Sequence, residues 1–232
     1  MARARVKVEP PLEGNAILAG HYSAAFLAKA VEPRVPLWAL ALAAQMIDVV
    51  WAVLVLVGVE HLRVDPSLAS NPLDLYDMPY THSLVGTLVW AALAFVITRR
   101  WLGSQRAALV MAATVVAHWV LDFVVHRPDL TLWGAPPKMG LALWDQPVLA
   151  LVVEIGLLIG SAALYVRVQS VPAVGRRAVA VFTTVLVVVQ LSTALAPPPL
   201  GPSGVAVTAL LLFLAAAWGA MRVERSIETA SA

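Results

Sequence analysis

The sequence predicts an all-α integral membrane protein, a polytopic bundle of six to seven transmembrane helices. Of its 232 residues, 60% are hydrophobic and only 13% are charged, whereas a soluble domain carries about 25% charged residues. Several apolar stretches also reach about 20 residues, the length that crosses a bilayer as a helix. The net charge of +2 is small, so a nucleic-acid partner is not expected. The chain has no cysteine, which excludes disulfides, thiolate metal ligands and cysteine nucleophiles.

Six stretches are long and apolar enough to span a membrane. They are Pro36–Val59, Tyr80–Thr98, Ala107–Val125, Pro147–Val166, Ala178–Ala196 and Gly204–Met221. Proline and glycine separate neighbouring stretches, as they do between the last two. The connections 60–79 and 127–146 are longer, and long loops in compact proteins are often functional. We expect a single membrane domain, in which residues 14–130 carry the site and residues 131–232 pack around it.

A weaker seventh stretch, Asn15–Val31, would come first. It follows an N-terminal arm, residues 1–13, which lacks the apolar core of a signal peptide. If this stretch spans, the N-terminus lies outside and His21 reaches the depth of the polar residues described below. If it is interfacial or re-entrant, the N-terminus stays inside. The first alternative, with seven helices, is favoured because three basic residues in the arm are weak topological evidence.

Basic residues are distributed unevenly among the connections. Lysine and arginine accumulate in cytoplasmic loops. Alternate connections and the C-terminal tail hold Arg99, Arg100, Arg106, Arg167, Arg176, Arg177, Arg222 and Arg225. The intervening loops hold only Arg63, Arg127 and Lys138, alongside several acidic residues. The distribution therefore predicts a cytoplasmic C-terminus.

Ionisable side chains occur inside the predicted spans. Each costs roughly 2.5–3.5 kcal/mol at a helix centre, so such groups usually face the bundle interior and serve a function. The set is His21, Asp48, His82, His118, Asp122 and Glu154, with His126 at a helix end. His118, Asp122 and His126 are spaced i, i+4 and i+8, which places them on one helix face. At about 1.5 Å per residue, the whole set falls in the external half of the bilayer and predicts a divalent-metal site.

Each of these residues also has a structural explanation. A lone intramembrane His or Asp often forms a hydrogen bond between helices. His82 and Ser83 fit the start of a helix, with Thr81 as the capping hydroxyl. Glu154 is either an interhelical acid or a general base, and His126 lies at a membrane–water boundary where such residues are common.

Four short motifs resemble a known family. Gly20-His21, Ile47-Asp48, Thr81-His82-Ser83 and His118-Trp119-Val120-Leu121-Asp122 follow one another in the first half of the chain. In this order they resemble the bacterial YdjM-like membrane-bound metal-dependent hydrolases, with G-H, P-D-x-D-H, H-R-x-x-T-H-S and H-x-x-x-D hallmarks. The ligand order is more distantly similar to that of zinc-dependent phospholipase C. The chain departs from the family at Gln45–Val49, where one acid and one histidine are missing, and at Asp77-Met78, which replace H-R.

The resemblance implies a metal-dependent hydrolase in the bacterial inner membrane. The implied metal ligands are His82, His118, Asp122 and Asp48, with His21 at the edge of the site or on a second ion. Imidazole and carboxylate ligands without thiolate suit zinc first, and also manganese or iron. A zinc-activated water, with a pKa of about 7, would attack a phosphoester or ester of a lipid-like substrate from the external leaflet. Asp48 or Glu154 would take the proton, and Arg127 would meet an anionic head group.

Two other functional classes fit the same residues. The reduced ligand set fits a non-catalytic accessory or scaffold subunit of a larger membrane complex, which would retain a hydrolase-like fold. Buried His and acid residues also mark small-solute transporters and proton relays. Matching Gly- or Pro-broken segments in the two halves of the chain, which would favour a repeat-built transporter, are not apparent in the sequence.

Overall fold

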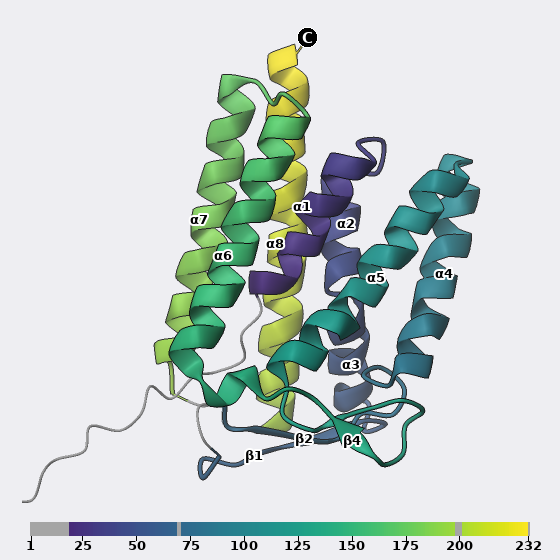
Figure 1. The fold of residues 1–232 in the computed structure, drawn as a ribbon, viewed down its shortest axis with the longest axis vertical. Helices are drawn as coiled ribbons and strands as arrows, with labels where there is room; N and C mark the ends of the chain where they lie inside the picture. The colour runs from purple at the N-terminus through teal and green to yellow at the C-terminus, as the bar shows by residue number, and fades with distance from the viewer. Residues whose placement is uncertain (1–18, 69–70, 198–200, 232) are drawn as a thin grey trace, which may run out of the picture.

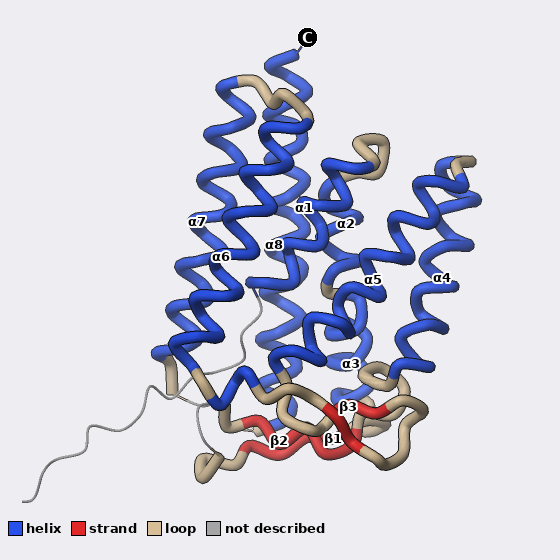
Figure 2. Tube along the Cα trace, viewed as in Figure 1, coloured by secondary structure: helices blue, strands red, loops and turns tan. Residues whose placement is uncertain are grey.

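Long helices and a thin layer of short strands at one end make up the chain (Figures 1 and 2). The computed structural model describes residues 19–68, 71–197 and 201–231. In chain order the elements are η1 Ala19–His21, α1 Tyr22–Val31, α2 Leu37–Ala44, α3 Met46–Leu56, β1 His61–Val64, β2 Leu73–Asp77, α4 Leu84–Leu102, α5 Gln105–Val125, β3 Leu130–Thr131, β4 Lys138–Met139, η2 Leu143–Asp145, α6 Pro147–Val168, α7 Ala173–Leu195 and α8 Pro202–Ser231.

Five helices, α4 to α8, are long and apolar enough to cross a membrane. The pair α2 and α3 adds a sixth span if it counts as one helix bent by 57° at Gln45. These six elements match the six apolar stretches of the sequence, and they support a multi-pass membrane protein. The break inside the stretch Pro36–Val59 was not predicted, because neither Gly nor Pro stands at the bend.

The expected seventh span is not found in the described part of the chain. Residues 1–18, which include the N-terminal arm and the beginning of the stretch Asn15–Val31, lie outside it. The described part consists of the 3 residues of η1 and the 10 residues of α1, about 20 Å of helix, against a hydrocarbon core of about 30 Å. The helix begins inside the bundle at Ala19 and ends before Pro33, so His21 is placed by a short internal helix.

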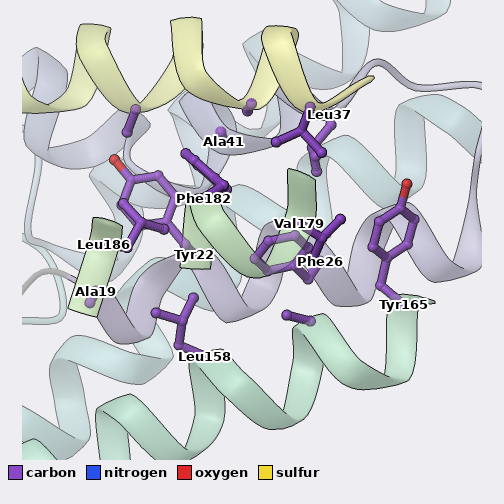
Figure 3. Packing of buried hydrophobic residues seen from close by; sticks show 14 of the residues in the cluster. Ala19, Tyr22, Phe26, Leu37, Ala41, Leu158, Tyr165, Val179, Phe182 and Leu186 are labelled. Atoms are coloured by element: carbon purple, nitrogen blue, oxygen red, sulfur yellow. The ribbon is translucent and has the colours of Figure 1, made fainter. Parts of the chain in front are cut away.

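The core around α1 is built from aromatic and aliphatic side chains of several helices (Figure 3). Phe26 of α1 stacks on Tyr165 of α6 at 5.9 Å between ring centroids, and meets the edge of Phe182 of α7 at 6.2 Å. Burying an aromatic side chain of this kind stabilises the fold by about 1.5–3 kcal/mol. This packing fixes α1 against its neighbours and thereby holds the helix end that carries His21.

Basic residues gather at the end of the bundle opposite the strands. The connections α1–α2, α4–α5 and α6–α7 lie there together with the C-terminus (Figure 1). In the first of them, the buried Glu32 carboxylate accepts bonds from Arg34 Nε at 2.7 Å and Nη2 at 3.0 Å. These hydrogen bonds hold the pKa of Glu32 below its usual value. The predicted segregation of charge is thus present between the two ends.

Short strands cover the other end of the bundle, where the sequence predicts only loops. Strands β1 and β2 pair antiparallel with an irregularity between His61 and Arg63, and β3 pairs antiparallel with β4. They are 2 to 5 residues long, too short to show an alternating pattern in the sequence. Leu73 and Leu75 of β2 pack with Trp51 and Trp144 in one buried cluster. The strand layer therefore closes the bundle end where the polar residues lie.

Candidate metal centre

Side chains from four separate parts of the chain converge near the strand-covered end of the bundle. His21 comes from η1, Asp48 from the first turn of α3, and His82 from the turn before α4. His118 and Asp122 lie one turn apart on α5. His21, His82, His118 and Asp122 are at most 3% exposed. All five sequence-predicted metal ligands are thus brought together.

Three histidines in this region have their Nδ1 atoms held by hydrogen-bond acceptors. His118 Nδ1 lies 2.7 Å from the carbonyl oxygen of Ala44. Ala44 is the last residue of α2, so the break before α3 makes this carbonyl available to the histidine. His126 Nδ1 lies 3.0 Å from the carboxylate of Asp129. His82 Nδ1 lies 2.9 Å from the Thr81 hydroxyl. A carbonyl and a carboxylate can only accept, so Nδ1 of His118 and of His126 must carry the proton.

The third anchor is fixed by a buried carboxylate. Thr81 Oγ1 donates to Glu60 Oε2 at 2.6 Å, so the same hydroxyl accepts from His82 Nδ1. Glu60 Oε1 accepts the backbone N–H groups of Tyr80 at 2.8 Å and Thr81 at 3.0 Å, and Glu60 is fully buried. Metal-binding histidines commonly show this arrangement, with the ring nitrogen remote from the metal bonded to a carboxylate or carbonyl.

The Nε2 atoms of these rings face carboxylate oxygens. His118 Nε2 lies 3.1 Å from Asp122 Oδ2, yet neither atom has a hydrogen-bond partner among the described residues. With its proton on Nδ1, a neutral imidazole offers only a lone pair at Nε2, and a carboxylate also offers only lone pairs. Two buried acceptors at this separation repel each other unless a cation lies between them. The arrangement therefore requires either a bound metal ion or an additional proton shared by the imidazole and the carboxylate.

The nitrogen–oxygen spacings in this group suit metal ligands. Zinc binds nitrogen and oxygen at about 2.0–2.2 Å, which places neighbouring tetrahedral ligand atoms about 3.3–3.6 Å apart. His82 Nε2 lies 3.2 Å from Asp48 Oδ1 and 3.7 Å from Asp122 Oδ2. His118 Nε2 lies 3.6 Å from Asp48 Oδ1 and 3.1 Å from Asp122 Oδ2. Each of these two nitrogens therefore lies at a ligand spacing from both carboxylates, and Asp48, His82 and His118 form one group close enough to hold an ion.

The second oxygen of Asp122 has its own neighbours. His21 Nε2 lies 2.9 Å from Asp122 Oδ1, and His126 Nε2 lies 3.3 Å from the same atom. His21, His118 and Asp122 also form a group close enough to hold a metal. Since His118 Nδ1 is bonded to Ala44, its single remaining nitrogen can serve only one ion. His126 was predicted to lie at a membrane–water boundary. Because its Nε2 faces the same Asp122 oxygen as His21, it belongs to the cluster.

Glu154 holds the end of the helix that carries His21. Its Oε2 accepts the Gly20 N–H at 3.2 Å, and Gln190 Oε1 accepts the Ala19 N–H at 3.0 Å. Such acceptors are needed because the first N–H groups of a helix have no partner within it, and hydrocarbon offers none. A Cβ on Gly20 would lie 2.8 Å from Glu154 Cγ, so only glycine fits there. The position supports a structural role for Glu154 more than the predicted role of general base.

Two other expectations meet a different geometry. Arg127, the predicted head-group ligand, donates from Nε to Asp145 at 2.9 Å; it is not among the described residues that line the cavity beside the cluster. Ser83, and not Thr81, caps α4, because its side chain accepts the Gly86 N–H at 3.0 Å. The Thr81 hydroxyl instead donates to Glu60. No role was predicted for Glu60, because it lies 21 positions before Thr81, at the start of a loop.

A cavity of about 300 Å³ opens beside the cluster. Five of the clustered residues line it: His21, Asp48, His82, Asp122 and His126. The opposite wall is apolar and comes from Trp51, β2 and α8. The cluster therefore has one side that is closed by protein and one side that a small group could approach.

The fold and the cluster together define a polytopic helical membrane protein with a buried histidine–aspartate centre. Comparison with models of known protein families, with curated proteins and with solved structures found no match. The argument for function therefore depends on the geometry of the centre.

Proposed function

We propose that the protein is a membrane-embedded, metal-dependent hydrolase acting on a phosphoester or ester of a lipid-like substrate. One observation carries the proposal. His82 and His118 are held by their Nδ1 bonds in the tautomer that directs a lone pair toward Asp48 and Asp122, at spacings that suit metal ligands. The resemblance of the four motifs to membrane-bound hydrolases adds the reaction class.

The residues around the cavity suit hydrolysis. A zinc ion held by His82, His118 and Asp122 would keep its fourth position for water, would lower the pKa of that water to about 7, and would polarise a phosphoryl or acyl oxygen. Asp48 is 15% exposed at its side chain, against 3% for Asp122, and it lines the cavity. Asp48 is therefore the carboxylate best placed to accept a proton from an attacking water. Trp51 and the apolar wall exclude bulk water from the reacting group.

Orientation completes the proposal. The arginine-rich end, including the C-terminus, faces the cytoplasm of a bacterial cell, and the strand layer and the centre lie toward the external leaflet. This assignment follows from the positive-inside rule. Lipid would then reach the centre from the outer half of the bilayer.

Metal content of the purified protein is the first test. We expect zinc, manganese or iron to copurify and to be lost in His118→Ala, because this side chain is fully buried and its Nε2 has no other partner among the described residues. His61→Ala is the matched control: His61 is exposed on β1, is bonded to Asp77 at 2.7 Å, and belongs to neither group of side chains that could hold an ion. Elemental analysis of both variants and the wild type gives the answer.

Hydrolysis must follow metal. We expect a chromogenic phosphodiester to be cleaved by wild-type protein and by His61→Ala, with loss on chelation, recovery on adding the metal back, and loss in His118→Ala. A stable protein that contains no metal and binds none would contradict the proposal and favour protonated histidines, as in a proton relay. Metal without hydrolysis would favour the accessory-subunit alternative.

A further inference from the structure

The cavity beside the cluster adjoins a larger apolar groove between α7 and α8. The groove has a volume of about 580 Å³. Three residues, Thr193, Leu212 and Phe213, line both the groove and the cavity. Ala19 and Tyr22, at the beginning of the short internal helix, also line the groove. The groove therefore meets the cavity of the histidine–aspartate cluster at these three shared side chains.

The groove runs lengthwise along the two helices. On α8 its lining extends from Leu212 to Ser226, a rise of about 21 Å. It leads away from the strand layer toward the end of the bundle that carries Arg177 and Arg222 (Figure 1). A lipid whose head group lies at the cluster would extend its tail in this direction. One leaflet of hydrocarbon is about 15 Å deep, so the groove is long enough for a chain that crosses it.

The walls suit hydrocarbon. Most lining residues are Ala, Val, Leu and Phe, and the helices that carry them are candidate membrane spans. Val181, Val185 and Trp218 are more than half exposed along the groove, so it opens sideways to the surrounding bilayer. A chain of methylene groups can enter from there without crossing water.

The width selects among occupants. A volume of 580 Å³ over about 21 Å gives a mean cross-section of roughly 28 Å². A helix is about 10–12 Å wide with its side chains, so only single side chains of a helix could enter the groove. A single hydrocarbon chain fits inside along its whole length. The adjoining polar cavity favours a lipid as well, because a lipid has both a tail for the groove and a head group for the cluster.

We propose that the α7–α8 groove binds one hydrocarbon tail of a membrane lipid and presents the head group of that lipid to the histidine–aspartate cluster. The assignment of the lipid as substrate rests on the proposed hydrolase function. Tail binding itself depends only on the groove.

Photocrosslinking tests the tail directly. The protein is reconstituted in vesicles of phosphatidylcholine and phosphatidylglycerol that contain a phospholipid with a diazirine in its acyl chain, and adducts are mapped by mass spectrometry. We expect adducts to concentrate on groove residues of α7 and α8. Ala215→Trp should abolish this enrichment, because Ala215 lines the groove and is exposed. Ala92→Trp is the control, since Ala92 is equally exposed on α4 and lies outside the groove.

The outcomes separate the two proposals. Equal labelling of lipid-facing positions on α4, α7 and α8 would overturn the groove assignment. The hydrolase proposal would still stand if the same protein binds metal. Crosslinks between α7 or α8 of two chains would also overturn it, because a second copy would then cover the groove. Enrichment of adducts in the groove that persists in His118→Ala supports tail binding. The same enrichment in a wild-type protein that contains no metal would also support tail binding, but it would contradict the hydrolase proposal.

Discussion

Replacing Glu60 by Gln tests whether the tautomer of His82 is set through Thr81. Glu60 accepts three hydrogen bonds, from the Tyr80 and Thr81 N–H groups on Oε1 and from Thr81 Oγ1 on Oε2. A glutamine amide has the same shape, but one of its ends donates. If its oxygen keeps the two N–H groups, its NH₂ meets Thr81 Oγ1. That hydroxyl then loses the acceptor for its own proton and can donate it to His82 Nδ1, which favours the tautomer with the ring proton on Nε2.

With its proton on Nε2, His82 cannot bind a metal. Loss of a partner behind a metal-binding histidine typically lowers metal affinity by about 10–100-fold, equivalent to about 1.4–2.7 kcal/mol. We expect a change of this size in Glu60→Gln. The free energy of unfolding should also fall by about 1–3 kcal/mol, because bonds to a buried carboxylate are replaced by weaker neutral ones.

The assay is competition for the metal against a chelator of known affinity. Asp77→Asn is the matched control, because Asp77 is also a carboxylate bonded to a neighbouring side chain, His61 at 2.7 Å, but its own side chain is 43% exposed in the strand layer. Thermal unfolding of both variants without metal measures the purely structural part. Wild-type metal affinity in a folded Glu60→Gln protein would refute the argument that Glu60 acts through Thr81 on His82.

Three further predictions use other contacts. Thr81→Val should weaken metal binding, and Thr81→Ser should restore it, because the hydroxyl alone links the ring to its carboxylate; the same chelator competition measures both. Gly20→Ala should lower the free energy of unfolding by about 1–3 kcal/mol, since its Cβ would lie 2.8 Å from Glu154 Cγ; Gly156→Ala, with nothing within 4 Å, is the control in thermal unfolding. Glu32 has a pKa below its usual value when folded, so the stability that wild type gains over Glu32→Gln should be present above pH about 4.3 and vanish as the pH falls through the lowered pKa. A difference that stays constant with pH would contradict the last of these.

The periodic features of this chain could be predicted from its sequence. Apolar length alone located α4 to α8, because a membrane span needs little more than about 20 apolar residues. Helical periodicity also placed His118 and Asp122 on one face, and their ring and carboxylate lie 3.1 Å apart. Both predictions depend on patterns of residue type within one short stretch of the chain.

Features that depend on distant partners could not be predicted in this way. The bend at Gln45 has no Gly or Pro to mark it, and it exposes the Ala44 carbonyl that fixes the His118 ring. Glu60 reads as a loop acid until Thr81, 21 positions later, is placed against it. The short helix formed by η1 and α1 begins inside the bundle, where Gln190 and Glu154 accept the N–H groups of Ala19 and Gly20.

Charge balance limits what the centre can hold. Asp48 and Asp122 contribute two negative charges to the four-atom group, and the histidines facing them are neutral when they act as ligands. One divalent ion therefore makes this group electrically neutral, which matters because an unbalanced charge is costly in a site without bulk water. A second divalent ion beside His21 and His126 would add two positive charges, of which the Asp129 carboxylate bonded to His126 balances one. The family motif supplies a further acid at the position where this chain has Met46, so its absence and the charge count both favour a single ion.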